Sequence, residues 1–161
     1  MVNNRGYVTH GFTLVELVVT ILLLAILSVV ALPRLMGAGS YSAYALRQEF
    51  ISELRRVQLL AITNPDRCYR INIDNGGYQL SHLQQDCSTL IANETQHAFP
   101  RNTRIQLLAN SRDTFSVQFD SDGRSVFLPA GLGCNGNCLQ VMADDTLGIA
   151  IEAEGYIHEG G

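Results

Sequence analysis

The sequence of 161 residues contains no lysine, so its eleven basic side chains are all arginines. Fifteen aspartates and glutamates outnumber them and give a formal net charge of −4. Nucleic-acid-binding surfaces normally combine clustered cations with interleaved aromatic side chains. Arg55–Arg56 and the scattered Arg101, Arg104 and Arg112 lack that pattern. We therefore expect these arginines to lie on solvated faces, and we expect no nucleic acid among the partners.

Motifs of catalytic and metal centres are also missing from the sequence. No nucleophile motif frames its serines, histidines and aspartates, so we expect no catalytic residue and no enzyme activity. The four histidines show no paired spacing. The spacing of Asp120, Asp122 and Gly123 resembles part of a calcium-binding loop, but the remaining ligands of an EF-hand are missing. An Asp-Gly hairpin turn explains these residues. We expect neither a cofactor nor a bound metal.

Four cysteines are present, and they suit an oxidising compartment such as the periplasm. Four cysteines allow three pairings. An expected hairpin turn near Gly76 brings residues 68 and 84 opposite one another, so Cys87 lies just beyond the partner position of Cys68. The Cys134-Asn-Gly-Asn-Cys138 segment can close on itself. We favour Cys68–Cys87 and Cys134–Cys138 disulfides. A zinc site made of all four cysteines is the alternative.

The longest apolar run extends over Leu17–Leu32, and its only polar members are Thr20 and Ser28. Counted from Phe12, the segment reaches about 31 Å as a helix, close to the thickness of a bilayer's hydrocarbon core. It can therefore span a membrane once. Glu16 is anomalous at its entrance, because a carboxylate there is costly unless a partner neutralises it.

The stretch Gly11-Phe12-Thr13-Leu14-Val15-Glu16, followed by the apolar run, resembles the prepilin signature of type IV pilins and type II secretion pseudopilins. The resemblance implies that residues 1–11 are a leader. It implies that prepilin peptidase cleaves between Gly11 and Phe12 and methylates the new amino terminus at Phe12. Glu16 then becomes an assembly residue that pairs with the amino terminus of a neighbouring subunit. Pro33 matches a proline of many pilins and implies a helix kink.

An ordinary secretory signal over residues 1–32 is the alternative, with small residues at 37–40 near a cleavage site. The apolar run is longer than the apolar region of a typical secretory signal, and such signals do not carry a glutamate like Glu16 at its entrance. Arg5 and Arg34 balance each other and leave the orientation undecided. The pilin resemblance implies a cytoplasmic amino terminus, a single pass through the inner membrane, a periplasmic C-terminal domain and later incorporation into a pilus or pseudopilus. The implied partners are prepilin peptidase, other major and minor pilins or pseudopilins, and the inner membrane.

After Pro33, about 128 residues remain, which is enough for one domain with a modest core. Apolar residues recur at steps of three and four from Ala43 to Ala61, as in an amphipathic helix. Asn64-Pro65 ends this pattern, because proline biases the preceding residue away from helix. We therefore expect residues 12–33 to form the transmembrane half of one long helix and residues 34–64 its amphipathic half.

From residue 65 the helical period gives way to alternation, which is typical of strands. Turns are expected at Asn75–Gly77, Asp120–Gly123 and Ala143–Gly148, and an irregular chain at 84–103. The seven or eight expected strands include 68–74, 78–83, 104–108, 115–119, 125–128, 139–142, 149–153 and 156–158. The pattern predicts an α+β fold in which a long N-terminal helix packs on an antiparallel β domain at 65–161.

The final third resembles the H-type minor pseudopilins and their type IV pilus relatives. The similarity lies in a phenylalanine strand, an Asp-rich turn with Gly123, and a closing Ile149-Ala-Ile151 and Gly155-Tyr-Ile157 pair. It implies a minor structural subunit that primes or builds a type IV pilus, such as the mannose-sensitive haemagglutinin (MSHA) pilus, or a type II secretion pseudopilus. The alternative is a minor pilin that captures DNA for uptake. Relatives of that kind carry a basic surface, which this acidic sequence does not predict.

Overall fold

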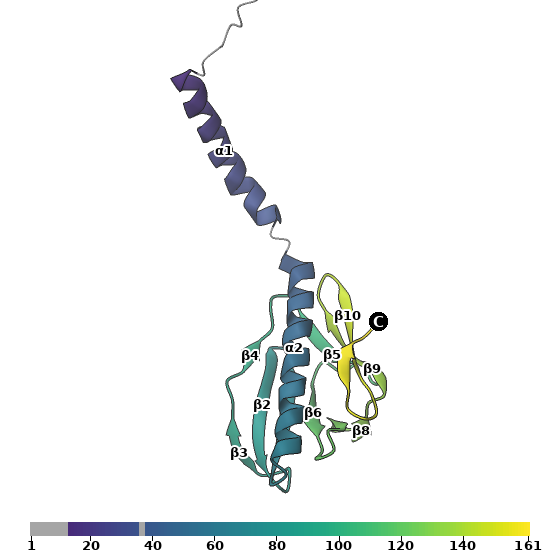
Figure 1. Ribbon diagram of the computed structural model, residues 1–161. Helices are drawn as coiled ribbons and strands as arrows, with labels where there is room; N and C mark the ends of the chain where they lie inside the picture. The colour runs from purple at the N-terminus through teal and green to yellow at the C-terminus, as the bar shows by residue number, and fades with distance from the viewer. Residues whose placement is uncertain (1–12, 36–37) are drawn as a thin grey trace, which may run out of the picture. The chain divides into compact units, whose positions relative to one another are not determined.

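The computed structural model describes residues 13–35 and 38–161, and it describes side chains for 13–27 and 43–161. The chain divides into two compact units, Met1–Gly37 and Ala38–Gly161, which we describe separately. The first unit contains helix α1, Leu14–Leu35. The second contains helix α2, Ala38–Thr63, followed by eleven strands within the described residues (Figure 1).

Helix α2 ends at Thr63, immediately before the Asn64-Pro65 signal. The backbone N–H and the side chain of Asn64 both donate hydrogen bonds to the Leu60 carbonyl oxygen, at 3.0 and 3.1 Å, and so close the last turn. The apolar stripe faces inward as expected. Its buried members are Ala43, Leu46, Phe50, Leu54, Val57 and Ala61.

Seven strands form the larger sheet, sheet A, which is antiparallel throughout and has the order β3-β2-β1-β6-β7-β8, with β4 paired to β2. Alternate residues of β1, β6 and β7 are buried, which is the pattern of a sheet with one face in the core. The strands are β1 Arg67–Asp74, β2 Gly77–Gln84, β3 Leu90–Asn93, β4 His97–Ala98, β6 Phe115–Phe119, β7 Ser125–Leu128 and β8 Leu132–Gly133.

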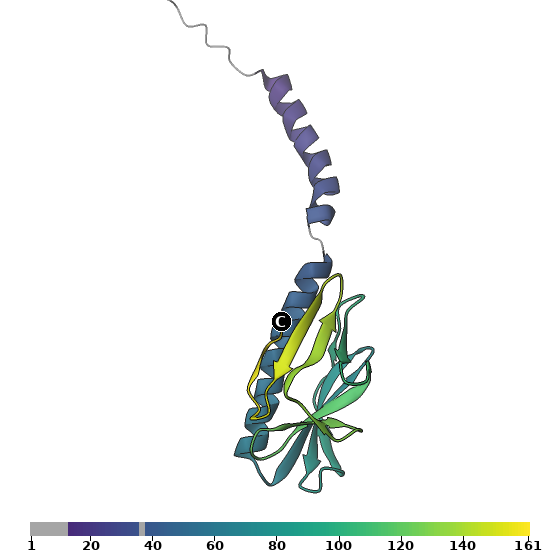
Figure 2. The same ribbon diagram turned by 90° about the vertical axis from the view of Figure 1, so that its right-hand side faces the viewer.

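Four strands form the smaller sheet, sheet B, which is also antiparallel and has the order β11-β10-β9-β5. Helix α2 contacts strands of both sheets, and Figure 2 shows it along one side of them. Helix and sheets enclose one core, in which Phe50 of α2 meets Tyr78 of β2 with ring centroids 5.1 Å apart. The strands of sheet B are β5 Arg104–Leu107, β9 Gly136–Met142, β10 Thr146–Ile151 and β11 Ile157–Glu159.

The observed strands depart from the expected ones at several points, among them β9, which begins at Gly136 and not at 139. Strands β3 and β4 lie within the chain expected to be irregular, and β8 was not expected at all. Strand β10 begins at Thr146, because the turn before it is closed by a short hydrogen bond from Ala143 N–H to the Asp145 carbonyl oxygen. The fold class is nevertheless the expected one, a helix packed on antiparallel sheet.

A tight turn shifts the β1–β2 register by one residue from the expected one. Cys68 lies opposite Leu83, because the chain turns at Asn75–Gly76 and Gly77 already belongs to β2. Gly77 is required there for a steric reason, since a Cβ atom would collide with the carbonyl oxygen of His97 in β4.

Candidate assembly site

The amino-terminal end of α1 is built around Thr13, which caps the helix. The Thr13 hydroxyl oxygen accepts a hydrogen bond from the Glu16 backbone N–H at 3.2 Å, and the Thr13 carbonyl oxygen accepts one from Leu17 N–H at 3.1 Å. Threonine at this position satisfies a backbone donor that the helix itself leaves unpaired. Helix α1 therefore begins at Leu14 with a defined first turn.

Glu16 lies in that first turn, where the helix macrodipole favours a negative charge. Its carboxylate forms no ion pair with any described part of the chain. Thr13 is a site residue that the sequence reasoning missed, although the Thr-x-x-Glu spacing of a capping box signals it. Thr13 and Glu16 together place an unpaired carboxylate at the entrance of an apolar helix.

The side chains of α1 that the structure describes present apolar groups in every direction. Ile21, Leu22 and Leu23 are all more than half exposed, although consecutive residues of a helix point about 100° apart. A helix that is apolar all round is expected to find apolar surroundings outside its own chain. Among the described residues, no helix combines the length and apolarity needed to cross a membrane.

Gly11, Phe12 and Pro33 are the residues predicted for processing and for the kink in the amino-terminal helix. Gly11 and Phe12, the expected cleavage pair, lie outside the described residues. Helix α1 continues through Pro33 and ends at Leu35. The kink at Pro33 therefore stays a prediction, as does cleavage.

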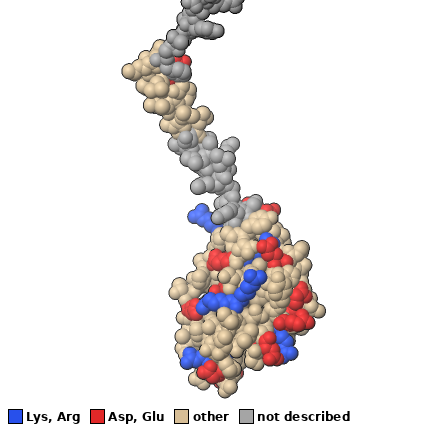
Figure 3. Space-filling model, in the orientation of Figure 1, with Lys and Arg blue, Asp and Glu red and all other residues tan. Residues whose placement is uncertain are grey.

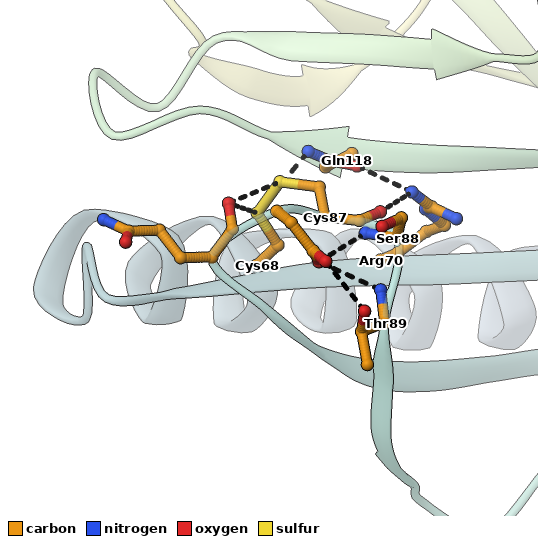
Figure 4. The surroundings of a disulfide bond; sticks show 8 residues. Cys68, Arg70, Cys87, Ser88, Thr89 and Gln118 are labelled. Carbon is orange, nitrogen blue, oxygen red and sulfur yellow. Dashed lines mark hydrogen bonds between the residues drawn. A yellow bond between two sulfur atoms is a disulfide. The ribbon is translucent and has the colours of Figure 1, made fainter.

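The four cysteines are joined as Cys68–Cys87 and Cys134–Cys138, the pairs that the sequence favoured, with Cα atoms 5.2 and 6.0 Å apart. Figure 4 shows the first pair beside Arg70, which donates a hydrogen bond to the Cys87 carbonyl oxygen at 2.6 Å. Among the described residues, no group of three or more metal-binding side chains is found.

Cys87 lies within a compact turn at Asp86–Thr89, between β2 and β3. Asp86 accepts hydrogen bonds from the backbone N–H groups of Ser88 and Thr89, both at 2.9 Å. These bonds, with the Thr89 hydroxyl, hold the pKa of the Asp86 carboxyl below its usual range. The turn positions Cys87, which adopts a left-handed backbone with φ of 55°, against β1.

If both disulfides form in the isolated protein, non-reducing peptide mapping should recover Cys68 linked to Cys87 and Cys134 linked to Cys138. The chain-entropy model gives about 3 kcal/mol of stabilisation for the first loop and about 2 kcal/mol for the second. Replacing the first pair by alanines should therefore lower the free energy of unfolding more than replacing the second. Four free thiols with stoichiometric zinc would contradict this prediction.

The Asp120–Gly123 segment forms the expected hairpin turn between β6 and β7. Asp120 accepts backbone hydrogen bonds from Asp122 at 3.0 Å and Arg124 at 2.8 Å, and the Arg124 guanidinium contacts both carboxylates. Burial alone would raise the pKa of Asp120, but the hydrogen bonds from Arg124 outweigh it and lower the pKa. Arg124 thus contacts both carboxylates of this turn and offsets one of their two negative charges.

Long-range ion pairs attach α2 to the sheets. The nearly buried Arg47 pairs with Glu159 of β11 at 2.7 Å. Arg56 pairs with Glu53 and with Glu94, both at 2.7 Å, and His82 of β2 reaches Glu94 at 2.9 Å. The Arg56 guanidinium lowers the pKa of Glu94. The pairs Arg47–Glu159 and Arg56–Glu94 were missed from the sequence, because their partners lie far apart along the chain, whereas Arg56–Glu53 lies within α2.

Two of the arginines considered for nucleic-acid contact have partners within the fold. Arg104 lies 4.0 Å from Asp113, and Arg55 donates to the Ile157 carbonyl oxygen at 2.6 Å. Figure 3 shows basic and acidic side chains interspersed on the face in view. Such mixing weakens any long-range attraction to a polyanion.

Comparison with known proteins yields a motif and a fold. The family model for the prokaryotic N-terminal methylation motif matches residues 8–32. Two crystal structures of the type IV minor pilin FimU of Pseudomonas aeruginosa PAO1 are similar in fold. The one in space group P21 is 15% identical, covers 74% of this chain and 88% of its own, and gives a TM-score of 0.53. The one in space group P65 is 14% identical, covers 73% of this chain and 92% of its own, and gives a TM-score of 0.51.

No curated protein sequence matches the chain. At these low identities the likeness to FimU shows the fold alone, and this fold is pilin-like. The methylation motif is matched separately, on the residues that carried the resemblance in the sequence. Motif and fold together support the type IV pilin superfamily.

Proposed function

We propose that this chain, which carries the prokaryotic N-terminal methylation motif ahead of a minor-pilin-like fold, is a minor pilin. It acts as a structural subunit without enzyme activity, and it helps to prime or build a filament together with other pilins. The observation that carries the proposal is that one chain contains both the motif with Glu16 and its apolar helix, and a unit of α2 and β-sheets that resembles a minor pilin in fold. Either feature without the other would support much less.

The proposed location follows from the order of the parts. Prepilin peptidase removes residues 1–11, the apolar segment holds the subunit in the inner membrane, and the Ala38–Gly161 unit lies in the periplasm until the subunit enters the filament. The two disulfides support an oxidising compartment. The fold likeness to a type IV minor pilin favours a pilus over a type II secretion pseudopilus, and the general similarity of the N-terminal segment favours the MSHA pilus.

Processing provides the direct test of this proposal. We expect cleavage between Gly11 and Phe12, with the apolar helix retained and Phe12 N-methylated, because the leader is short and the motif precedes the apolar run. Intact-mass measurement of the membrane-extracted protein, with and without prepilin peptidase, identifies the new amino terminus. A mature chain that starts near residue 40 would indicate an ordinary secretory signal and would end the pilin proposal.

DNA capture is the competing function, and the charge distribution opposes it. A fragment from about residue 40 onward should give no shift of duplex DNA at physiological salt, because acidic residues accompany its arginines. The measurement is a mobility-shift titration over a range of salt concentrations. Tight binding that collapses with added salt, and is lost in Arg104→Gln or Arg112→Gln, would place DNA uptake first.

A further inference from the structure

A cleft with a volume of about 550 Å³ lies at the ends of three neighbouring strands of sheet A, β1, β6 and β7. Its lining comes from three separate parts of the chain. The end of β1 supplies Asn72–Asp74, the segment leading into β6 supplies Arg112 and Thr114–Ser116, and the end of β7 supplies Leu128–Pro129. The volume is within the range of small-ligand sites.

Several polar groups of this cleft are left with hydrogen-bonding capacity. The exposed Arg112 guanidinium and Thr114 hydroxyl have no partner in the described part of the chain. Asp74 Oδ1 accepts from the backbone N–H groups of Gly76–Gly77 at 2.7 and 3.0 Å, whereas Oδ2 has only Gln96 Nε2 at 3.4 Å. The cleft therefore offers both strong donors and a carboxylate acceptor.

A row of neutral side chains holds the floor of the cleft in place. Ser116 Oγ donates to Asn72 Oδ1 at 2.8 Å, Asn72 Nδ2 donates to Ser81 Oγ at 2.7 Å, and Ser81 Oγ donates to Asn93 Oδ1 at 2.7 Å. The row crosses β6, β1, β2 and β3. Such a network fixes the positions of Asn72 and Ser116 before any ligand arrives.

We propose that this cleft binds a neutral saccharide. A sugar hydroxyl both donates and accepts hydrogen bonds, so adjacent hydroxyls satisfy Asp74 and Arg112 together. A polyanion would meet the Asp74 carboxylate in the same cleft, which opposes its binding. Leu128–Pro129 supplies an apolar strip against which the C–H face of a sugar ring packs.

A peptide strand fits this cleft less well than a saccharide. Extended peptides bind by adding to an unpaired sheet edge or by filling apolar pockets. Both β1 and β6 are paired on each side, so the cleft at their ends offers no unpaired strand edge to which a peptide could add. Glycan binding here goes beyond the structural role and is independent of filament assembly.

Saturation-transfer NMR on the full chain tests the proposal. The protein is held in lauryldimethylamine oxide micelles, a detergent without a sugar headgroup. The probes are cellotetraose, β-1,4-galactotetraose and tetra-N-acetylchitotetraose, with tetragalacturonate as the acidic counterpart and a neutral tetrapeptide. We expect the unaltered chain to bind at least one neutral tetrasaccharide, and Arg112→Gln to weaken that binding roughly tenfold or more.

Arg101→Gln is the matched control, because Arg101 is also exposed and unpartnered in the described part of the chain but does not line the cleft. It should bind as the unaltered chain does. Thr114→Val supplies a second cleft variant should Arg112→Gln alter the unfolding temperature. The proposal is overturned if no neutral probe binds, if the cleft variants bind as well as the control, or if tetragalacturonate or the peptide is preferred.

Discussion

Glu16→Ala is expected to remove this protein from assembled filaments while leaving its membrane insertion and its folding unchanged. Insertion should persist, because removing a charge makes the helix more apolar. The helix start should persist too, since Thr13 caps the backbone N–H of residue 16 and not its side chain. Folding of the Ala38–Gly161 unit should not change, because that unit has its own core.

The expected defect lies in pairing between subunits. In a filament, the proposed partner of the Glu16 carboxylate is the amino terminus of a neighbouring subunit. Removing one member of a pair in a low-dielectric helix bundle leaves the other charge unpaired, which costs about 3–5 kcal/mol. A cost of that size corresponds to a loss of incorporation of roughly a hundredfold or more.

The measurement is crosslinking to other pilins in membranes, together with the amount of subunit in sheared filaments. Glu16→Asp keeps the charge and should restore part of the crosslinking. Thr20→Ala is the matched control, because Thr20 lies one turn further along α1 and its hydroxyl donates only to the Leu17 carbonyl oxygen of its own helix. Equal crosslinking yields for Glu16→Ala and the unaltered protein would show that Glu16 is not an assembly residue.

The fold class and the inward face of α2 could be predicted because both depend on local patterns. Steps of three and four between Ala43 and Ala61 require only the geometry of a helix, and Asn64-Pro65 requires only a local backbone conflict. The alternation in β1 and β6 follows equally from the geometry of a strand. These signals need no knowledge of what the segment packs against.

Strands β3 and β4 and the division into two sheets could not be predicted, because they depend on contacts between residues far apart in the sequence. All four residues of β3 are exposed, so they show no alternation, and β4 has only His97–Ala98. Their strand conformation comes from pairing with β2, which a local pattern does not record. The division into two sheets likewise follows from β1 pairing with β6, and β5 with β9.

The candidate site divides in the same way. Glu16 and its helix could be identified from contiguous residues, and the Thr13 cap was readable in the same stretch. The cleft of Asp74, Arg112 and Thr114 could not be identified, because its groups meet only after β1 pairs with β6. Arg112 therefore looked like one more solvated arginine in the sequence.

Phe50→Ala is expected to produce the largest loss of stability in the Ala38–Gly161 unit. Phe50 is fully buried on the inner face of α2, and its ring meets Tyr78 edge-on at 5.1 Å. Truncating a buried phenylalanine removes its apolar burial and leaves a cavity, at a cost of about 3–5 kcal/mol. For a unit of this size the unfolding temperature should fall by roughly 10–20 °C.

The loss should extend to the polar group next to Phe50. The Tyr78 hydroxyl donates to Glu49, and burial, reinforced by the Glu49 carboxylate, raises the pKa of the Tyr78 phenol so that it stays protonated. A cavity beside this ring loosens the pair, so the near-ultraviolet circular dichroism of tyrosine should weaken before global unfolding. Thermal and urea unfolding of the full chain measure the stability itself.

Leu59→Ala is the matched control, because Leu59 lies on the same helix but its side chain is 61% exposed. Removing an exposed apolar side chain should change the free energy of unfolding by only about 0.5 kcal/mol or less. The difference between the two variants isolates burial from helix propensity, since both create alanine within α2. Similar losses for both, or a loss of under about 1 kcal/mol for Phe50→Ala, would show that this face of α2 does not form the core.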